Sequence, residues 1–381
     1  MKRNLMAFVL IAMGFFALYA LTAQRGLGWG DSGEFQYRIL SCADGITGGC
    51  ESFATAHPLY VALAKAIART PFQVTLVSSF FGALAVGGFF LCTHRIGLTV
   101  VFGLSHMLWW LSCLAEVQTM NLAFTVFETA LVLRFLSSGR GVWLVSALFL
   151  SGVHLACHNF ALLALPVYGV LLLRSGWRTR IAGGAAWAAG ASFWLQALAA
   201  HGAADVLVGR FGGQVSGLVP ANWTVAGFNL ALSALSFVAP VSIAWWNRRT
   251  KQTDRQRDVR WTLWALFAIN ALFFVRYFVP DQVTFLLPTL FFAFLLASVY
   301  ETRRDRAIAL AVMQILLPVL AYQVLVQLPV PKDRQPHPHR NDAKYFAFPW
   351  KFNDDSADRC AAELGGTWNG YPDCGKKECA K

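Results

Sequence analysis

Apolar runs recur from one end of the chain to the other, and short polar segments separate them. Each run holds roughly 17 to 25 residues, the length that an α-helix needs to cross the hydrocarbon core of a membrane. The pattern therefore predicts an all-α membrane protein, a multispanning bundle of about eleven transmembrane helices. The predicted spans cover residues 5–23, 72–93, 96–114, 119–136, 142–158, 160–174, 181–200, 223–246, 261–278, 283–300 and 307–328.

The first apolar run begins like a secretory signal, because Lys2 and Arg3 precede it. The run is long for a signal peptide, and no cleavage motif of small residues closes it before Gln24 and Arg25. We therefore expect residues 5–23 to remain in the protein as its first transmembrane helix.

The distribution of basic residues predicts the orientation in the membrane. Cytoplasmic loops of membrane proteins collect Lys and Arg, whereas short loops on the other side do not. With a cytoplasmic N-terminus, the predicted inner loops hold 17 of the 32 Lys and Arg residues, the outer loops hold six, and the C-terminal tail holds nine. The sequence therefore predicts a cytoplasmic N-terminus and a tail on the outer side, which in a bacterial inner membrane is the periplasm.

Composition agrees with a membrane protein and argues against nucleic-acid binding. Hydrophobic residues make up 56% of the chain and charged residues 14%. The formal charge of +12 comes mostly from short basic clusters between apolar runs, without a basic face or an aromatic platform for bases. We expect membrane lipids as partners and no nucleic acid.

The chain is expected to have two parts. A transmembrane domain covers residues 1–328 and includes the first exoplasmic loop, residues 24–71. A small exoplasmic tail, residues 329–381, begins with the Pro-rich run PVPKDRQPHPH. About fifty residues bury too little apolar surface to form a core of their own, so we expect the tail to cap the outer face.

Cysteine positions agree with an oxidising outer compartment. Cys42 and Cys50 enclose a short Gly-rich loop on the predicted outer side, where a disulfide bridge could join them. The tail carries three further cysteines, Cys360, Cys374 and Cys379. Their odd number leaves the pairing open, and their spacing from the tail histidines fits no familiar zinc site.

Candidate chemistry gathers in the first outer loop. The stretches WGDSGEFQYRIL and HPLYVALAKAI place Asp31, Glu34 and His57 in a segment too polar to cross a membrane. The predicted topology brings further polar residues to the same side. These are Glu116, His158, Arg276, Asp281 and Gln282. We therefore expect an active site that faces the exoplasm and is built from several loops over the helical bundle.

The residues of the first loop also have plain structural explanations. Asp31 and Glu34 match a capping box at the start of a helix that would run through Ile39. A carboxylate fixed at a helix start is also well placed to accept a proton, so the two roles are compatible. His57 precedes Pro58, so it could cap the next helix, or it could contact the phosphate or sugar of a donor.

Glu116 lies near the outer end of a span, where it could belong to a site or extend to the membrane surface as an interfacial carboxylate. His154 and His158 are four residues apart, as metal ligands on one helix face would be, but two ligands do not make a metal site. We expect His154 to pack between helices and His158 to contact the donor.

Arg276 ends a predicted span on the outer side, just before Asp281 and Gln282. Its guanidinium could bind the phosphate of a lipid donor, or it could extend to lipid headgroups without a specific ligand. Asp281 and Gln282 follow a proline, so they are either donor-binding or acceptor-binding residues or residues of a turn.

Several motifs in this order resemble a known family. They are WGDSGEF with AHPLYVALAKAI, AEVQTMNLAF, GVHLACHNFALLALP, VPDQVTFLLPT and, in the tail, RNDAKYFAFPWK. The chain thereby resembles the polytopic family of protein O-mannosyltransferase-like glycosyltransferases, long filed under a "domain of unknown function" label. The likeness covers most of residues 29–300. Gln118 stands where that family usually has an aromatic residue, and Asn159 where a second histidine is common.

The resemblance implies the integral-membrane glycosyltransferase fold of type C. Such an enzyme moves a sugar, here of hexosyl or mannosyl type, from a polyprenyl-phosphate donor to a protein hydroxyl, a glycan or a lipid at the outer face. Inverting transfer needs a carboxylate to take the proton of the acceptor hydroxyl. The resemblance assigns this role to the acidic residues Asp31 and Glu34, and Asp31 either acts as the base or orients the acceptor. The use of a divalent metal stays open.

Two other functional classes also fit a chain with many spans. A transporter or lipid flippase would carry ionisable residues at the middle of the membrane, whereas the candidates above gather at one face. A non-catalytic membrane scaffold would tolerate the loss of Asp31.

Overall fold

The computed structural model describes residues 2–28, 31–41, 57–201, 227, 230, 233–234, 236–246, 254–277, 282–298, 308–317, 320 and 357–358. Over these residues every regular element is a helix, which confirms the all-α prediction. The elements are α1 (Lys2–Thr22), α2 (Asp31–Ser41), α4 (Pro58–Ile67), α5 (Pro71–Thr93), α6 (Ile96–Gly103), α7 (His106–Ser112), α8 (Gln118–Ser138), α9 (Gly141–Cys157), α10 (Ala161–Leu173), α11 (Trp177–His201), α14 (Val238–Trp246), α15 (Asp254–Arg276), the 3₁₀-helix η2 (Gln282–Phe285) and α16 (Leu286–Ala297).

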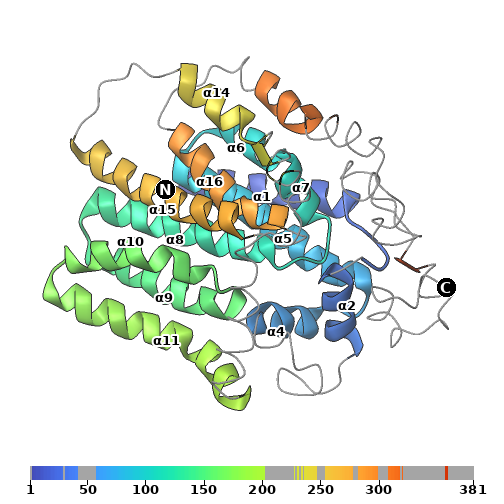
Figure 1. Cartoon of the computed structure of the whole chain (residues 1–381), viewed down its shortest axis with the longest axis horizontal. Coiled ribbons are helices and arrows are strands. Elements are labelled where there is room, and N and C mark those ends of the chain that lie inside the picture. The colour runs from blue at the N-terminus through green and yellow to red at the C-terminus, as the bar shows by residue number, and fades with distance from the viewer. Residues whose placement is uncertain are drawn as a thin grey trace.

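The long helices lie side by side along one direction, and the short helices α2 and α4 lie at one end of them (Figure 1). Four helices are long and apolar enough to cross a membrane: Arg3–Thr22, Pro71–Thr93, Gln118–Ser138 and Arg257–Arg276. The other apolar helices found in the described ranges are shorter. The protein is therefore an integral membrane protein, and the count of eleven spans stays a prediction.

The span predicted over residues 96–114 is not one helix. The chain breaks between α6 and α7, and the hydroxyl of Tyr19 in α1 donates to the carbonyl of Gly103 at 2.6 Å. This bond satisfies a carbonyl at the end of α6 that has no partner within the helix. Farther along, the backbone N–H of Gln24 donates to the carbonyl of Cys113 at 2.9 Å. Two short helices, α6 and α7, therefore take the place of the single predicted span, and hydrogen bonds join the end of each to α1 or to the residues just after it.

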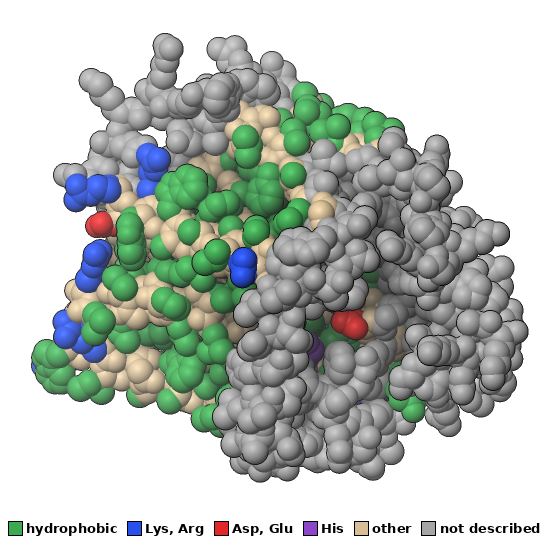
Figure 2. Space-filling model, in the orientation of Figure 1, with side chains coloured by type: hydrophobic (Ala, Val, Ile, Leu, Met, Phe, Trp, Pro, Cys, Tyr) green, Lys and Arg blue, Asp and Glu red, His purple; other side chains and the backbone are tan. Residues whose placement is uncertain are grey.

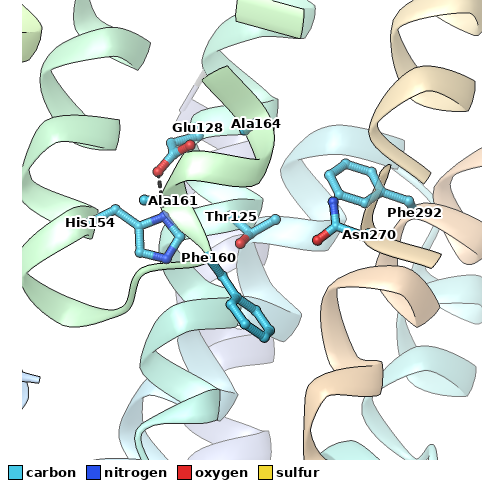
Figure 3. Close-up of a pocket in the computed structure, with 8 residues that line it drawn as sticks. All are labelled: Thr125, Glu128, His154, Phe160, Ala161, Ala164, Asn270 and Phe292. Carbon is cyan, nitrogen blue, oxygen red and sulfur yellow. Dashed lines mark hydrogen bonds and ion pairs between the residues drawn. The ribbon is translucent and has the colours of Figure 1, made fainter. Parts of the chain in front are cut away.

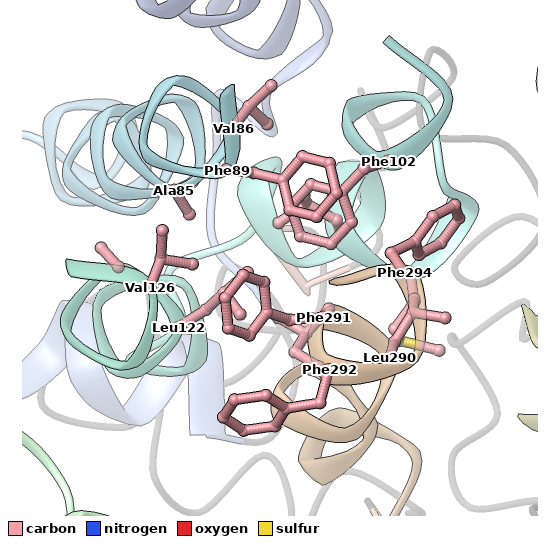
Figure 4. Close-up of a cluster of buried hydrophobic side chains, with 14 of the residues drawn as sticks. Ala85, Val86, Phe89, Phe102, Leu122, Val126, Leu290, Phe291, Phe292 and Phe294 are labelled. Carbon is pink, nitrogen blue, oxygen red and sulfur yellow. The ribbon is translucent and has the colours of Figure 1, made fainter. Parts of the chain in front are cut away.

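Aromatic side chains fix α16 against α5 and α6. Phe89 of α5 stacks on Phe102 of α6 with ring centroids 4.6 Å apart. Phe291 and Phe294 of α16 approach the Phe89 ring edge-on at 6.0 and 6.4 Å, and Figure 4 shows the four rings close together. Offset and edge-on contacts are the favoured arrangements of such rings, so this cluster joins a late helix to two early ones.

Basic side chains gather at the end of the bundle away from α2 and α4 (Figures 1 and 2). Arg134 lies 5.2 Å from the ring centroid of Trp143, and Arg174 lies 5.3 Å from that of Trp261. These are residues that the topology predicts at the cytoplasmic side. The compartment that this end faces stays a prediction.

Helices α9 and α11 approach so closely that their backbones touch. A Cβ atom added to Gly152 would clash with the carbonyl oxygen of Trp187, and one added to Gly190 would clash with that of Phe149. Small residues allow this kind of close packing between membrane helices. The pair α9 and α11 therefore depends on glycine at both crossing points.

We predict that Gly152→Ala separates α9 from α11, because its new methyl group meets backbone rather than a movable side chain. Overpacking of this kind destabilises a protein by about 1–3 kcal/mol. Thermal unfolding of the purified protein in detergent measures the effect. Gly184→Ala in α11 is the matched control, since its Cβ would meet nothing within 4 Å. Equal melting temperatures for both variants would contradict the prediction.

Candidate functional site

Helix α2 presents the acidic residues of the first loop. It begins at Asp31, as the capping pattern predicted, and runs two residues beyond Ile39 to Ser41. Asp31 is exposed and lies in the first turn, where the positive end of the helix dipole favours a carboxylate. Glu34 lies in the same helix, and its side chain is outside what the structure describes.

The Glu116 carboxylate lies next to α2. The hydroxyl of Ser32 donates to Glu116 Oε1 at 3.1 Å. Ser78 of α5 holds the backbone of the same residue, since its hydroxyl donates to the Glu116 carbonyl at 2.8 Å and accepts from the Glu116 N–H at 2.9 Å. Residues 31 and 116 therefore lie at one end of the bundle, although 85 positions separate them.

Gln36 fixes the loop that precedes Asp31, and sequence reasoning did not single it out. It is 1% exposed, and its Oε1 accepts from the N–H of Gly28 at 2.8 Å. Its Nε2 lies 3.2 Å from the Gly26 carbonyl, to which it donates. In the tail, Asp358 Oδ1 accepts from the N–H of Leu27 at 3.2 Å. The rest of the predicted cap, including Cys360, Cys374 and Cys379, lies outside the described residues, as do Cys42 and Cys50.

His57 occupies the N-cap position of α4, ahead of Pro58, which is one of the two roles that its position in the sequence allows. Its side chain makes no cap hydrogen bond. Instead, Nδ1 donates to the carbonyl of Cys157 at 2.8 Å, because a carbonyl can only accept. The His57 ring also contacts Phe35 of α2 and His158, with centroids 5.6 and 4.9 Å away. His57 thus connects the first loop to the end of α9.

His158 is buried in the link between α9 and α10, outside both helices. Its backbone is extended, with φ −157° and ψ 139°, so His154 and His158 do not share a helix face. Within the described part of the chain, no group of three His, Cys, Asp or Glu residues could hold a metal. Burial lowers the pKa of His158 well below 6.5, and the neighbouring His57 and His154 lower that pKa further.

Two of the remaining candidates, Arg276 and Gln282, lie at and just after the C-terminal end of α15. Arg276 is exposed and is the last residue of that helix, as predicted. Gln282 is fully buried, and its Nε2 donates to the Phe274 carbonyl at 2.8 Å. Gln282 therefore joins the start of η2 to the last turns of α15. Asp281 lies outside the described residues.

Glu128 is the acidic residue that the sequence interpretation missed. It lies at the centre of α8, is 1% exposed, and its Oε1 is 2.7 Å from His154 Nδ1. The Tyr168 hydroxyl of α10 donates to its Oε2 at 3.1 Å. The expectation that ionisable residues gather at one face is therefore wrong for Glu128 and His154. The signal was present, since a carboxylate in the middle of a predicted span marks a functional candidate by default.

A cavity of about 10 Å³ adjoins this pair, which is room for a single water molecule. Figure 3 shows Glu128 and His154 on one side of it and Asn270 and Phe292 on the other. Thr125 and Phe160 also line it. The cavity is too small for a sugar or a lipid headgroup, so it is not the substrate site.

Comparison with solved structures identifies the fold. The crystal structure of ArnT from Cupriavidus metallidurans bound to undecaprenyl phosphate is similar, with a TM-score of 0.61 and 14% sequence identity. The match covers 99% of this chain and 77% of the ArnT chain. The apo structure of the same protein matches 99% and 75%, with a TM-score of 0.59 and 15% identity. The chain therefore has the fold of ArnT. No protein-family model and no curated protein matches it.

We predict that acidification destabilises the protein through His158. Because its pKa is lower in the folded than in the unfolded chain, the unfolded state binds more protons below about pH 6.5, and stability falls by at most about 1.4 kcal/mol per pH unit. Melting temperatures between pH 8 and pH 5 should fall less in His158→Gln than in the wild type. His94→Asn is the control, since His94 is exposed and Asn tolerates its left-handed backbone, φ 54°. Parallel curves for wild type and His158→Gln would contradict the prediction.

Proposed function

We propose that this protein is a membrane glycosyltransferase that takes a sugar from a polyprenyl-phosphate donor at the outer face of the membrane. The observation that carries the proposal is the likeness over 99% of the chain to ArnT, which was crystallised with undecaprenyl phosphate. The acceptor is a protein hydroxyl, a glycan or a lipid. Fold alone does not specify chemistry, so the proposal also rests on the groups at the α2 end.

The groups at this end suit inverting sugar transfer. In such a reaction the acceptor hydroxyl loses its proton to a carboxylate while the anomeric carbon is attacked. Asp31 is the proposed base, because it is exposed in the first turn of α2. Glu34 shares that turn, and Glu116 lies beside it through Ser32. A second carboxylate near a base disfavours the charged form of both carboxylates, and so raises the affinity of the base for a proton.

The departing polyprenyl phosphate requires positive charge or hydrogen-bond donors. Arg276 is the proposed phosphate partner, since it ends α15 with an exposed guanidinium. His57 and His158 are proposed to contact the donor, with Asp281 and Gln282 at the same outer turn. A divalent metal stays compatible with the acidic residues, and the proposal requires none.

The motifs around Asp31, His57 and Glu116 further support a protein O-mannosyltransferase-like family with a hexosyl or mannosyl donor. We also propose a bacterial inner-membrane location with the α2 end and the tail in the periplasm. The gathering of basic side chains at the end of the bundle away from α2 supports this orientation.

The buried Glu128 is the observation that would favour a transporter or flippase instead. Its partners argue for another role, because His154 and Tyr168 occupy both oxygens. The adjoining cavity of about 10 Å³ is too small to hold a sugar or a headgroup. The enzyme proposal therefore explains more of the described residues than a transporter or flippase does. A non-catalytic scaffold would need none of the polar contacts at the α2 end.

We predict that Asp31→Asn and Asp31→Ala each lower sugar transfer by about 10²–10⁴-fold, the usual contribution of a positioned general base. The substitutions remove the proton acceptor, and Asn keeps the size and the capping capacity of the side chain. Transfer is measured from polyprenyl-phosphate [¹⁴C]mannose to membranes of a strain that lacks the gene.

The matched control is Asp258→Asn, because Asp258 is an exposed carboxylate near the N-terminal end of α15, away from Arg276. It should transfer sugar at the wild-type rate. Wild-type activity in both Asp31 variants would exclude Asp31 as the base, and absence of transfer from every polyprenyl-phosphate hexose by the wild-type protein would contradict the proposed function.

A further inference from the structure

A continuous line of polar side chains connects the α2 end of the bundle with the middle of α8. It runs from His158 to Gln118 at 3.2 Å and from Gln118 to Asn121 at 3.1 Å. It continues from Asn121 to His154 and from His154 to Glu128, each at 2.7 Å. All five side chains are at least nine-tenths buried. Each group between the two ends can either donate or accept, so the ends decide the direction of the bonds.

One end of the line is a backbone N–H, which can only donate. The N–H of Phe160 donates to His158 Nδ1 at 3.2 Å. Nδ1 therefore carries no hydrogen, and the ring keeps its proton on Nε2, because an imidazole retains at least one. His158 is thus neutral, and its Nε2–H must donate to Gln118.

The donation from His158 Nε2–H fixes the orientation of two side-chain amides, those of Gln118 and Asn121. In the structure, Gln118 Nε2 lies 3.2 Å from His158 Nε2, where two N–H groups would face each other. The ends of an amide side chain are assigned from their hydrogen bonds, and a half-turn brings Gln118 Oε1 to His158. Gln118 Nε2 then faces Asn121, whose amide turns in the same way and accepts with Oδ1.

These amide orientations determine the bond direction at the other end of the line. Asn121 Nδ2 now donates to His154 Nε2, so the His154 proton is on Nδ1 and is donated to Glu128 Oε1. A carboxylate can only accept, and Tyr168 donates to its other oxygen. A donor-only group at one end and an acceptor-only group at the other thus require the same direction.

The opposite direction fails at His158. If His154 donated from Nε2 to Asn121, Asn121 would donate to Gln118 and Gln118 would donate to His158 Nε2. His158 Nδ1 would still accept from Phe160, which leaves the imidazole without a proton. A charged His154 paired with Glu128 leads to the same conflict, because its Nε2–H must also donate to Asn121.

From this line of hydrogen bonds we infer that Glu128 is a positioning residue. As the accepting end of the line, its carboxylate holds His154 as the neutral Nδ1–H tautomer, and together with the Phe160 N–H at the donating end it holds His158 as the neutral Nε2–H tautomer. The His158 ring, whose centroid is 4.9 Å from that of His57, is thereby fixed against the α2 end. The direction of the bonds does not depend on the proposed function, whereas the effect on sugar transfer rests on it.

Nitrogen-15 NMR of histidine-labelled protein in detergent tests the inference. The pair of shifts from the two ring nitrogens differs between the Nδ1–H tautomer, the Nε2–H tautomer and the imidazolium. His154→Gln and His158→Gln spectra assign the signals. At pH 7 we expect one neutral tautomer at each ring, Nδ1–H at His154 and Nε2–H at His158. An imidazolium at His154, or Nδ1–H at His158, overturns the inference.

Glu128→Leu leaves the His154 Nδ1–H without an acceptor, so the wild-type direction then lacks one hydrogen bond. The reversed direction also lacks only one, the bond from the Phe160 N–H to His158, so the two directions can compete. We expect a second His158 tautomer to appear, and Glu128→Gln, which can still accept from His154, to restore the single form. Thr125→Val is the matched control, because Thr125 lines the same cavity and its hydroxyl donates to the Asn121 backbone carbonyl at 2.9 Å. Wild-type His158 signals in Glu128→Leu overturn the inference.

Sugar-transfer kinetics give a second measurement. Glu128→Leu should lower kcat at least tenfold, while the KM for the polyprenyl-phosphate donor stays within twofold. Unchanged kcat, together with the expected tautomers, would contradict the positioning role and leave the bond direction intact. A wild-type protein without transfer activity but with the expected tautomers would refute the proposed function alone.

Discussion

Polar groups inside this bundle must find their partners within the protein, because an apolar interior offers no water to replace a missing hydrogen bond. Glu128 is the most demanding case, as a carboxylate at the centre of α8 with 1% exposure. One of its oxygens pairs with His154 of α9 and the other accepts from Tyr168 of α10. The mutual placement of three helices therefore depends on one acidic side chain.

The same constraint organises the end of the bundle that carries the candidate site. Ser78 of α5 bonds both backbone groups of Glu116, and Gln36 bonds the loop that leads to Asp31. Groups from widely separated segments are thereby held in place before any substrate binds. Such preorganisation is what electrostatic stabilisation of a transition state requires, and it distinguishes this end from the arginine-rich opposite end.

The likeness to ArnT shows how little of this arrangement depends on sequence identity. The fold extends over 99% of the chain at 14% identity, so what is shared is the arrangement of helices. Within that arrangement, close packing depends on local features of this chain, such as the backbone contact of α9 with α11 at Gly152 and Gly190. Function must accordingly be argued from particular side chains and not from the fold alone.

The sequence by itself determined that the described part of the chain is helical and apolar enough to enter a membrane, because an apolar run of sufficient length leaves few other ways to satisfy the backbone. It also determined the helix start at Asp31 and the cap position of His57, which depend on neighbouring residues. Only the tertiary structure decided the break between α6 and α7, the separation of His158 from α9, and the partners of Glu128. Each of these depends on hydrogen bonds between residues 26 or more positions apart or on the path of a connecting segment. A local pattern carries no information about such partners, since it records what a residue can bond to and not what the fold brings within reach.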